Sequence, residues 1–427
     1  MTGRPSGEKG GAGPGAESVP DGPPGIGAPE SPAGATSLGN PAVVAAIRDA
    51  IAAAGGMIPF ARFMAIAAYH PGAGYYIGER RRPGRGGDFL TAPELHPMFG
   101  FALARQVADC WDRLDRPAAF TVREDGAGVG GLAYDILAAL HDERPDVAAA
   151  TRYRLVEANP HRRREAMVAM GEVGLDGQVE AVAPEEEAER PPIVGLALAN
   201  EVADAFPVCR LVIWDGAPRE VFVTWREDPA GFVGVEGPPE DPTWAARLLE
   251  SLAADGVSLV DGDRLDVSPA AAEWFGDVCR GIARGYALTV DYGYPARDLF
   301  RGHRLGGTLR AYHAHTVSDD PYVRVGEQDL TAHVDFTALT RAGEAAGAKL
   351  VGLTTQGAFL ASVGLGEWLP RLQADPGTDP ATYYRAQSAM FRLIDPGGMG
   401  RFGVLMMARD APVSPPPLGF REPAPPF

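Results

Sequence analysis

Short apolar runs alternate with amphipathic helical stretches through the middle of the chain. The runs AFTVRE, YRLVE and PIVGLALAN, at residues 119–124, 153–157 and 192–200, predict three buried strands. The stretches LAYDILAALHD and NPHRRREAMVAMG lie between them and have the residue spacing of helices. Strands and helices in this alternation are typical of a doubly wound, mostly parallel sheet, so an α/β fold is predicted.

The pattern changes after the third of these strands. Two short strand-like runs, RLVIWDG and EVFVTWRE, flank a Gly-Ala-Pro turn and predict a hairpin. Residues 240–280 look helical, and the stretch from about 210 to 280 is interpreted as an insertion. Ser268 followed by Pro269 predicts a helix start by capping rules, and this helix is expected to run to about Arg284.

Further elements are predicted on either side of these segments. Late strands are expected at YALTVDYG, KLVGLTTQ and RFGVLMMA, with a helix at VDFTALTRAGEAAG. Nearer the N-terminus, Asn40 with Pro41 predicts a capped helix start. Two more helices are expected, one over Pro59–Ala68 and one from about Pro97 to Leu114.

The two ends of the chain lack the apolar content that a folded core needs. Residues 1–39 are rich in Gly, Pro, Ala and Ser and predict a disordered tail, and residues 411–427 form a Pro-rich tail. No apolar run reaches the 18 residues of a membrane-spanning helix. The N-terminus has no apolar core of a secretory signal, so no such signal is expected.

Charge and cysteine content narrow the classes of function. The 427-residue chain has 39 Lys and Arg against 56 Asp and Glu, a formal net charge of −17. This balance argues against nucleic-acid binding and against adhesion to anionic membranes. Cys110, Cys209 and Cys279 are far apart and form no CxxC pair. We expect free thiols in a reducing compartment and therefore a cytoplasmic protein.

A Gly-rich loop follows the first strand and precedes a helix. Gly126, Gly128 and Gly130 form a GxGxG pattern after Glu124. Glycines at this point allow a tight turn and a close approach of the backbone to a ligand, so a nucleotide-type or adenosyl-type cofactor site is predicted. Gly126, Gly128 and Gly131 also satisfy GxGxxG, which leaves a nicotinamide cofactor open. A turn without any ligand is the remaining alternative.

Two polar positions end the second and third strands. Glu157 ends the second strand, 26 residues beyond Gly131, where a carboxylate can accept hydrogen bonds from ribose hydroxyls. Asn200, Glu201 and Asp204 follow the third strand and could bind a cation or accept protons. The alternatives are an ordinary exposed acid for Glu157 and a helix start for the Asn200 cluster.

Two further motifs are weaker indications of a functional site. The segment GDFLTAPE, from Gly87 to Glu94, follows an Arg-rich loop and has the composition of a turn with a helix cap. His313 and His315 have a metal-like HxH spacing, but no acid-His-His set accompanies them. We therefore predict no metal site.

Together these segments resemble the MidA-like S-adenosylmethionine-dependent methyltransferases, relatives of the mitochondrial complex I assembly arginine methyltransferase. The resemblance covers about residues 40–408 and depends on the joint order of motifs that are each weak alone. These motifs are YHPGAGYY, GDFLTAPE, EDGAGVGGL, LVEANP, NEVADAFPV, GYALTVDYG, GTLRAYHAH, VDFTAL and TQGAFL.

The resemblance implies a class I methyltransferase core of Rossmann-like, doubly wound α/β type, with N-terminal helices and a helical and hairpin insertion. It divides the chain into a helical segment at 40–118, with a loop that covers the cofactor, and a core at 119–410. It implies a cofactor loop of Glu124, Gly126, Gly128 and Gly130, and an acid, Glu157, that binds the ribose. It implies a signature that closes over the cofactor, made of Gly87, Asp88, Thr91, Pro93 and Glu94. It also implies a polar motif beside the reactive methyl, made of Asn200, Glu201 and Asp204. Asp291, Tyr292 and His315 also match family positions.

The activity that the resemblance implies is methyl transfer from S-adenosylmethionine, with arginine of a protein as the expected acceptor and Glu201 and Asp204 as its clamp. The expected partner is a protein substrate, without nucleic acid and without membrane insertion, and the sequence leaves the oligomeric state open. Arg123 and Asp125 stand where the family usually has apolar residues, and His96 where it often has a small hydroxyl residue. Because two charges in a buried strand are costly unless paired, a catalytically weakened assembly factor is the main alternative. A nicotinamide-dependent oxidoreductase is the other.

Overall fold

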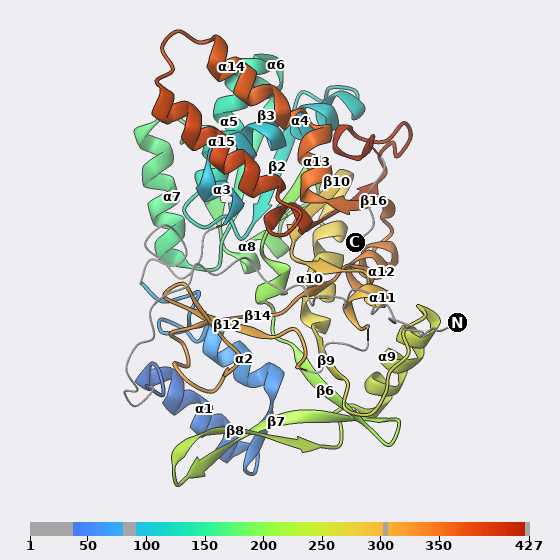
Figure 1. Cartoon of the computed structure of the whole chain (residues 1–427). Helices are drawn as coiled ribbons and strands as arrows, with labels where there is room; N and C mark the ends of the chain where they lie inside the picture. The colour runs from blue at the N-terminus through green and yellow to red at the C-terminus, as the bar shows by residue number, and fades with distance from the viewer. Residues whose placement is uncertain (1–36, 80–90, 302–305, 423–427) are drawn as a thin grey trace, which may run out of the picture.

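A seven-stranded sheet forms the centre of the molecule (Figure 1). The structure is a computed structural model, which describes residues 37–79, 91–301 and 306–422. The strand order is β16-β17-β10-β5-β2-β3-β4, and β17 alone runs antiparallel to its neighbours in this sheet. The fold class predicted from the sequence is confirmed. The strands are β2 (Phe120–Asp125), β3 (Thr151–Val156), β4 (Val179–Val182), β5 (Ile193–Asn200), β10 (Ile282–Asp291), β16 (Lys349–Thr355) and β17 (Gly403–Arg409).

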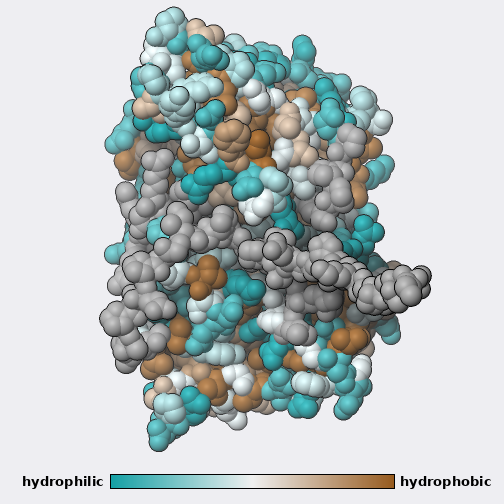
Figure 2. All heavy atoms as spheres, viewed as in Figure 1, coloured by the Kyte–Doolittle hydropathy of each residue, from teal (hydrophilic) through white to brown (hydrophobic). Residues whose placement is uncertain are grey.

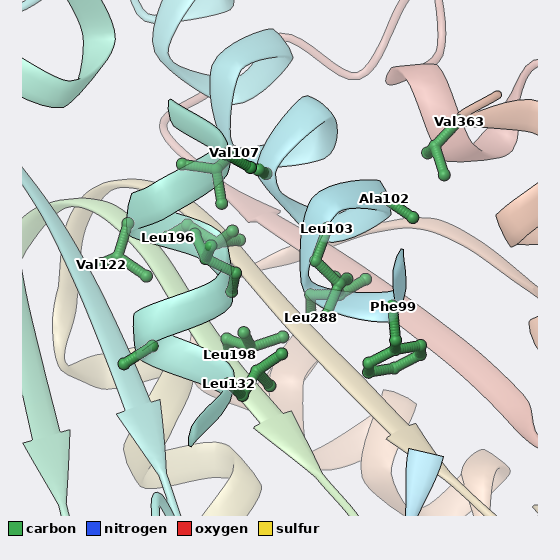
Figure 3. Packing of buried hydrophobic residues seen from close by; sticks show 14 of the residues in the cluster. Phe99, Ala102, Leu103, Val107, Val122, Leu132, Leu196, Leu198, Leu288 and Val363 are labelled. Atoms are coloured by element: carbon green, nitrogen blue, oxygen red, sulfur yellow. The ribbon is translucent and has the colours of Figure 1, made fainter. Parts of the chain in front are cut away.

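Helices cover both faces of this sheet. On one face α4 (Met98–Arg113) and α5 (Gly131–Glu143) contribute to one buried cluster with the strands (Figure 3). This cluster includes Leu103, Val107, Leu132, Val122, Leu196, Leu198 and Leu288. On the other face α10 (Pro269–Arg280) and α12 (Phe336–Ala345) pack against β10 and β17. Further helices are α6 (Pro145–Ala150), α7 (Pro160–Glu172), α8 (Pro184–Ala188), α13 (Gln356–Ser362), α14 (Trp368–Ala374) and α15 (Pro380–Ile394).

A second layer of structure, here called the lower module, lies below the sheet in Figure 1. Its five-stranded antiparallel sheet has the order β1-β7-β6-β9, with β8 paired to β7. The lower module comprises α1 (Pro41–Ala53), β1 (Met57–Pro59), α2 (Phe60–Tyr69), β6 (Cys209–Trp214), β7 (Ala217–Glu227), β8 (Ala230–Gly237), β9 (Arg264–Val267), β12 (Arg310–His313), β13 (Thr316–Ser318) and β14 (Asp329–Thr331).

One hydrophobic core joins the parts of the lower module. Val43 and Phe63 come from the N-terminal helices, Phe232 from β8, and Leu309 and Leu330 from the late hairpin region, and all are buried. Three segments that are far apart in the sequence therefore pack together because each has one apolar face that needs a partner. Figure 2 shows hydrophilic and hydrophobic side chains interspersed over both the sheet end and the lower end of the viewed face.

The local capping predictions are confirmed, but two predicted helical spans were too long. The Asn40 side chain accepts a hydrogen bond from Ala42 N, and the Ser268 hydroxyl accepts one from Ala271 N. The helix that starts after Ser268 ends at Arg280, and Gly281 leads directly into β10.

The helical interpretation of residues 240–280 is correct for α9 (Pro242–Ala254) and α10 but wrong for Arg264–Val267. These four residues form β9, which pairs with β6. The run is too short to show a periodicity, so pairing with a distant strand decides its conformation. No helix among the described residues is long and apolar enough to cross a membrane.

Candidate active site

A cavity of about 1310 Å³ opens where the strands β2, β3 and β5 end. It lies between the sheet and the lower module, because α2 and the residues after it supply part of its wall. Its lining includes most of the described positions that the sequence singled out, namely Thr91, Pro93, Glu94, Glu124, Gly126, Gly128, Glu157, Asn200, Glu201 and Asp204. Gly130 lies in the same loop, and Gly87 and Asp88 lie outside the described residues.

The Gly-rich loop has a backbone that only glycine adopts easily. The φ angles of Gly126, Gly128 and Gly130 are 70°, 57° and 81°. A Cβ atom on Gly126 would lie 2.5 Å from Cγ2 of Val202, and one on Gly130 would lie 2.9 Å from Cε of Met170. The loop therefore brings its backbone close to neighbouring elements in a conformation that side chains would strain.

Glu157 holds the loop from the end of β3. Its Oε2 accepts a hydrogen bond from Gly128 N at 2.9 Å, and its Oε1 accepts one from Asn159 N at 2.7 Å. The residue is 6% exposed and lines the cavity. Each carboxylate oxygen can accept a second hydrogen bond, so Glu157 has room for two hydroxyl donors.

Glu124 lies at the end of β2, just before the loop. The hydroxyl of Tyr153 donates to its Oε2 at 2.7 Å. Burial raises the pKa of Glu124 from 4.5 to about 8, since the charged form loses its hydration. Because the pKa is raised on folding, Glu124 favours the folded state at low pH and loses this contribution as pH rises through about 8.

We expect the stability of the protein to fall between pH 6 and pH 9, and Glu124→Gln to reduce that fall. The glutamine keeps the shape and an acceptor for Tyr153 but has no charge to desolvate. Urea unfolding midpoints at the two pH values measure the effect. Glu172→Gln, a change at an exposed position in α7, should leave the fall unchanged. Equal pH dependence in Glu124→Gln and the unmodified protein would contradict the assignment.

The turn after β5 carries the polar cluster Asn200, Glu201 and Asp204. Glu201 has a φ of 53°, an uncommon conformation for a residue other than glycine. Its Oε1 accepts hydrogen bonds from Asn200 Nδ2 at 3.1 Å and from Ala92 N at 3.3 Å. The turn continues into the short helix η1 (Ala203–Ala205). The strained residue is thus held between the strand end and the segment that carries Thr91 to Glu94.

Asp291, at the end of β10, anchors this turn through hydrogen bonds to its backbone. Its Oδ2 accepts backbone hydrogen bonds from Val202, Ala203 and Asp204 at 3.1, 2.9 and 3.3 Å. Asp291 is fully buried and does not line the cavity. Its part is therefore to fix the turn that presents Glu201 and Asp204.

The cluster has more hydrogen-bond acceptors than donors. Burial raises the pKa of Glu201 to about 8 and that of Asp204 to about 6. Oδ1 of Asn200 and Oδ1 of Asp204 are buried and have no hydrogen-bond partner among the described residues. Because unsatisfied buried acceptors are costly, this region is suited to a ligand that brings N–H donors and positive charge.

Two tyrosines complete this wall, and the sequence analysis assigned them no role. The Tyr69 hydroxyl donates to the carbonyl of Ala205 at 3.1 Å, and the Tyr76 hydroxyl donates to Oδ1 of Asp329. Their rings stack with centroids 5.5 Å apart, and both residues line the cavity. Both belong to the quoted motif YHPGAGYY, but only the contact with β14 and η1 shows what they do.

The other predicted positions take structural roles or lie elsewhere. Thr91 N donates to Oε2 of Glu94 at 3.1 Å, in a capping box at the start of α3 (Ala92–Leu95), as the composition indicated. Nδ1 of His96 accepts from Met98 N at 3.2 Å. The Tyr292 ring packs against Phe402.

The two histidines of the HxH spacing lie in β12 and in the turn that follows it. The described residues contain no group of three His, Cys, Asp or Glu side chains that could hold a metal ion. His313 Nδ1 lies 3.0 Å from the carbonyl oxygen of Glu327. His315 is exposed in the turn between β12 and β13 and is not among the residues that line the cavity.

Comparisons with known proteins identify the family. Residues 102–354 match the model of an S-adenosyl-L-methionine-dependent methyltransferase family. The chain belongs to this family. A protein from Burkholderia thailandensis, crystallised with S-adenosyl-homocysteine, is 34% identical with a TM-score of 0.79 over 89% of this chain and 94% of that chain.

Curated relatives agree with this assignment. The mitochondrial protein arginine methyltransferase NDUFAF7 homolog of Drosophila melanogaster is 29% identical over 376 residues, 82% of each chain. NDUFAF7 of Mus musculus, also named a mitochondrial protein arginine methyltransferase, is 27% identical over 369 residues, 81% of this chain and 79% of that protein. The protein is thus an S-adenosylmethionine-dependent methyltransferase and not a nicotinamide-dependent oxidoreductase.

The cavity of this methyltransferase fits its cofactor. Gly126, Gly128 and Gly130 form a cradle that a Cβ atom would obstruct at two positions. Glu157 can accept from two ribose hydroxyls, and Thr91, Pro93 and Glu94 line the same cavity. These residues would hold S-adenosylmethionine, which supplies an activated methyl group when bound.

The charged pair in β2 lines the cavity and takes part in an ion-pair network. Nη2 of Arg123 donates to Oδ1 of Asp125 at 2.7 Å, and Nε of Arg123 lies 3.6 Å from Oε1 of Glu187. Arg154 also contacts Glu187 at 3.0 Å, so the buried charges form one network. The sequence feature that suggested a weakened enzyme is therefore a compensated set of charges.

We expect Arg123→Leu to lower the unfolding free energy by about 3 kcal/mol, since it leaves Asp125 buried without its partner. The double variant Arg123→Leu/Asp125→Leu should regain most of that loss, because it removes both charges and restores an apolar strand. Urea denaturation of the two variants and the unmodified protein measures both values. A double variant less stable than Arg123→Leu would contradict this account.

Proposed function

We propose that this methyltransferase transfers the methyl group to the guanidinium of an arginine in a protein substrate. The buried, unpartnered Oδ1 atoms of Asn200 and Asp204, beside the carboxyl group of Glu201, carry the proposal. Arginine is the side chain that offers five N–H donors, no acceptor and a permanent positive charge. The relatives named above as protein arginine methyltransferases support the same acceptor.

The carboxylates of Glu201 and Asp204 are assigned as the clamp of the guanidinium. A guanidinium forms paired, charge-assisted hydrogen bonds with carboxylates, which fix its plane as well as its position. An arriving positive charge also lowers the pKa of both acids from the values that burial gives them, so the pocket becomes ionised as the substrate enters. This coupling favours a cationic acceptor over a neutral one.

Tyr69 and Tyr76 extend the acceptor wall beside this clamp. Because each hydroxyl proton is committed to Ala205 or Asp329, each phenol oxygen can face the substrate only as an acceptor. The acceptor nitrogen loses one proton when it becomes methylated, and Glu201 or Asp204 is placed to receive it. The protein thus positions the nitrogen, excludes water and takes up the proton.

We also propose that the protein works in the cytoplasm. Its cysteines are free, with Cys110 and Cys279 buried, which suits a reducing compartment. The Drosophila melanogaster and Mus musculus relatives are named mitochondrial, and that location is theirs. Fractionation of source cells with an antibody against the chain decides this point, and recovery in a membrane-bound compartment would overturn it.

Methyl labelling tests the acceptor assignment. Purified protein is incubated with radiolabelled S-adenosylmethionine and proteins from source cells that lack the gene, and labelled protein is hydrolysed to amino acids. The expected label is on methylated arginine and absent when Asp204→Asn replaces the unmodified enzyme. Label on lysine, on carboxyl groups or only in the small-molecule fraction would overturn the proposal.

A further inference from the structure

Asn159 lies between the ribose acid and the tyrosine wall. Its backbone N–H donates to Oε1 of Glu157 at 2.7 Å, and its side chain is 83 positions away in sequence from Tyr76, yet in contact with it. Nδ2 of Asn159 donates to the carbonyl of Tyr76 at 2.8 Å and to the carbonyl of Gly78 at 3.1 Å. The residue is 1% exposed, so these bonds are shielded from water.

The same side chain also fixes the helix that follows. Oδ1 of Asn159 accepts from His161 N at 2.9 Å and from Arg162 N at 3.4 Å, which caps α7. A cap needs only the oxygen of the side chain. The amide nitrogen is therefore free to bond elsewhere, and it donates to the two carbonyls at residues 76 and 78 rather than to its own helix.

The segment that these carbonyls belong to also reaches the turn after β5, because the Tyr69 hydroxyl donates to the carbonyl of Ala205. Its backbone hydrogen bonds are local, since Tyr76 N donates to Ala68 O and Gly78 N donates to Gly74 O. The Tyr76 side chain points the other way and donates to Asp329 of the lower module. Asn159 thus ties the end of β3, where the ribose is expected, to the segment that carries an acceptor-side residue.

We propose that Asn159 is a positioning residue through which cofactor bound at Glu157 stabilises the Tyr69–Gly78 segment. Ribose hydroxyls that fix the Glu157 carboxylate also fix the N–H of Asn159, and its amide then holds the carbonyls of Tyr76 and Gly78. The role of Tyr76 toward substrate rests on the proposed function, but the link from cofactor to segment does not. Cofactor bound at Glu157 therefore stabilises the acceptor wall that Asn159 already holds in place.

Hydrogen exchange with S-adenosylhomocysteine as the probe tests this link without any acceptor. Asn159→Asp and Asn159→Ser both keep an oxygen that can cap α7, and both remove the amide donor. Asn40→Ser is the matched control, because Asn40 caps α1 and also precedes a proline. Isothermal titration establishes that each variant still binds the probe.

In the unmodified protein and in Asn40→Ser, saturating S-adenosylhomocysteine should slow exchange in residues 69–78 by about tenfold. In both Asn159 variants the probe should bind within about fivefold of the normal affinity, while the slowing in residues 69–78 falls below about threefold. Slowing of exchange in the Gly-rich loop should persist in all four proteins, which shows that the site is occupied.

Three results would overturn the link. They are no slowing of residues 69–78 in the unmodified protein, full slowing in both Asn159 variants, or loss of probe binding in both. The last would make Asn159 part of the cofactor site itself. A negative outcome of the arginine labelling experiment would leave this result unaffected, because no acceptor is present in the exchange measurement.

Discussion

Gly126→Val should weaken the binding of S-adenosylhomocysteine by at least about 100-fold, a loss of roughly 2.7 kcal/mol. The φ of Gly126 is 70°, which strains any side chain, and a Cβ atom would lie 2.5 Å from Val202. A valine can be accommodated only if the loop moves, and the loop carries the backbone that faces the cofactor. Isothermal titration of the purified variant measures the loss.

Gly171→Ala is the matched control for this substitution. Gly171 lies in α7 and does not line the cavity, its φ is not positive, and a Cβ atom there would meet no atom within 4 Å. Its affinity should stay within about threefold of the unmodified protein, and alanine should even favour the helix. Binding by Gly126→Val within the same range would contradict the assignment of the loop as the cofactor cradle.

Glu201→Gln should lower methyl transfer by about 100-fold while leaving the affinity for S-adenosylhomocysteine within a few-fold, because a lost charge-assisted pair costs about 2–4 kcal/mol. The glutamine keeps an oxygen that can accept from Ala92 N and Asn200 Nδ2, so the turn should remain in place. It cannot form a charged pair with a guanidinium or take up its proton. Transfer to protein arginine and titration with S-adenosylhomocysteine give the two values.

Comparing the loss of methyl transfer with the loss of affinity for S-adenosylhomocysteine decides the role of Glu201. If cofactor affinity falls as much as turnover, then the residue supports the cofactor loop rather than the acceptor. Glu94→Gln serves as a comparison, since Glu94 also lines the cavity but its Oε2 is used in the capping box with Thr91 N. We expect that variant to affect stability of α3 more than the rate of transfer at saturating substrate.

The sequence predicted the seven-stranded sheet and its helices well, because the patterns that indicate these elements extend over only a few neighbouring residues. Buried parallel strands are continuous apolar runs, and the helices between them show their own spacing. The Gly-rich loop and the polar cluster at residues 200–204 follow such strands directly, so their place at one edge of the sheet follows from the topology alone. Capping of α1 and α10 was equally readable from two adjacent residues each.

The errors and omissions arise where distant segments decide the outcome. β9 forms because β6 pairs with it, and Tyr76 enters the site because Asp329, 253 positions later, accepts from its hydroxyl. His315, which matches a family position, lies in an exposed turn outside the cavity. Residue type and spacing cannot report such contacts.

The sequence by itself therefore determined the fold class and the polar positions at the strand ends of this methyltransferase, because hydrophobic periodicity and strand-loop-helix motifs act over a few residues. The family was indicated by the joint order of motifs along residues 40–408. Only the tertiary structure decided that Arg123 pairs with Asp125, that Asp291 anchors the turn after β5, and that Asn159 joins the end of β3 to the segment of Tyr76. Each of these depends on side-chain contacts that form when the chain has already closed its core, and free energy there is set by burial and partners rather than by residue type.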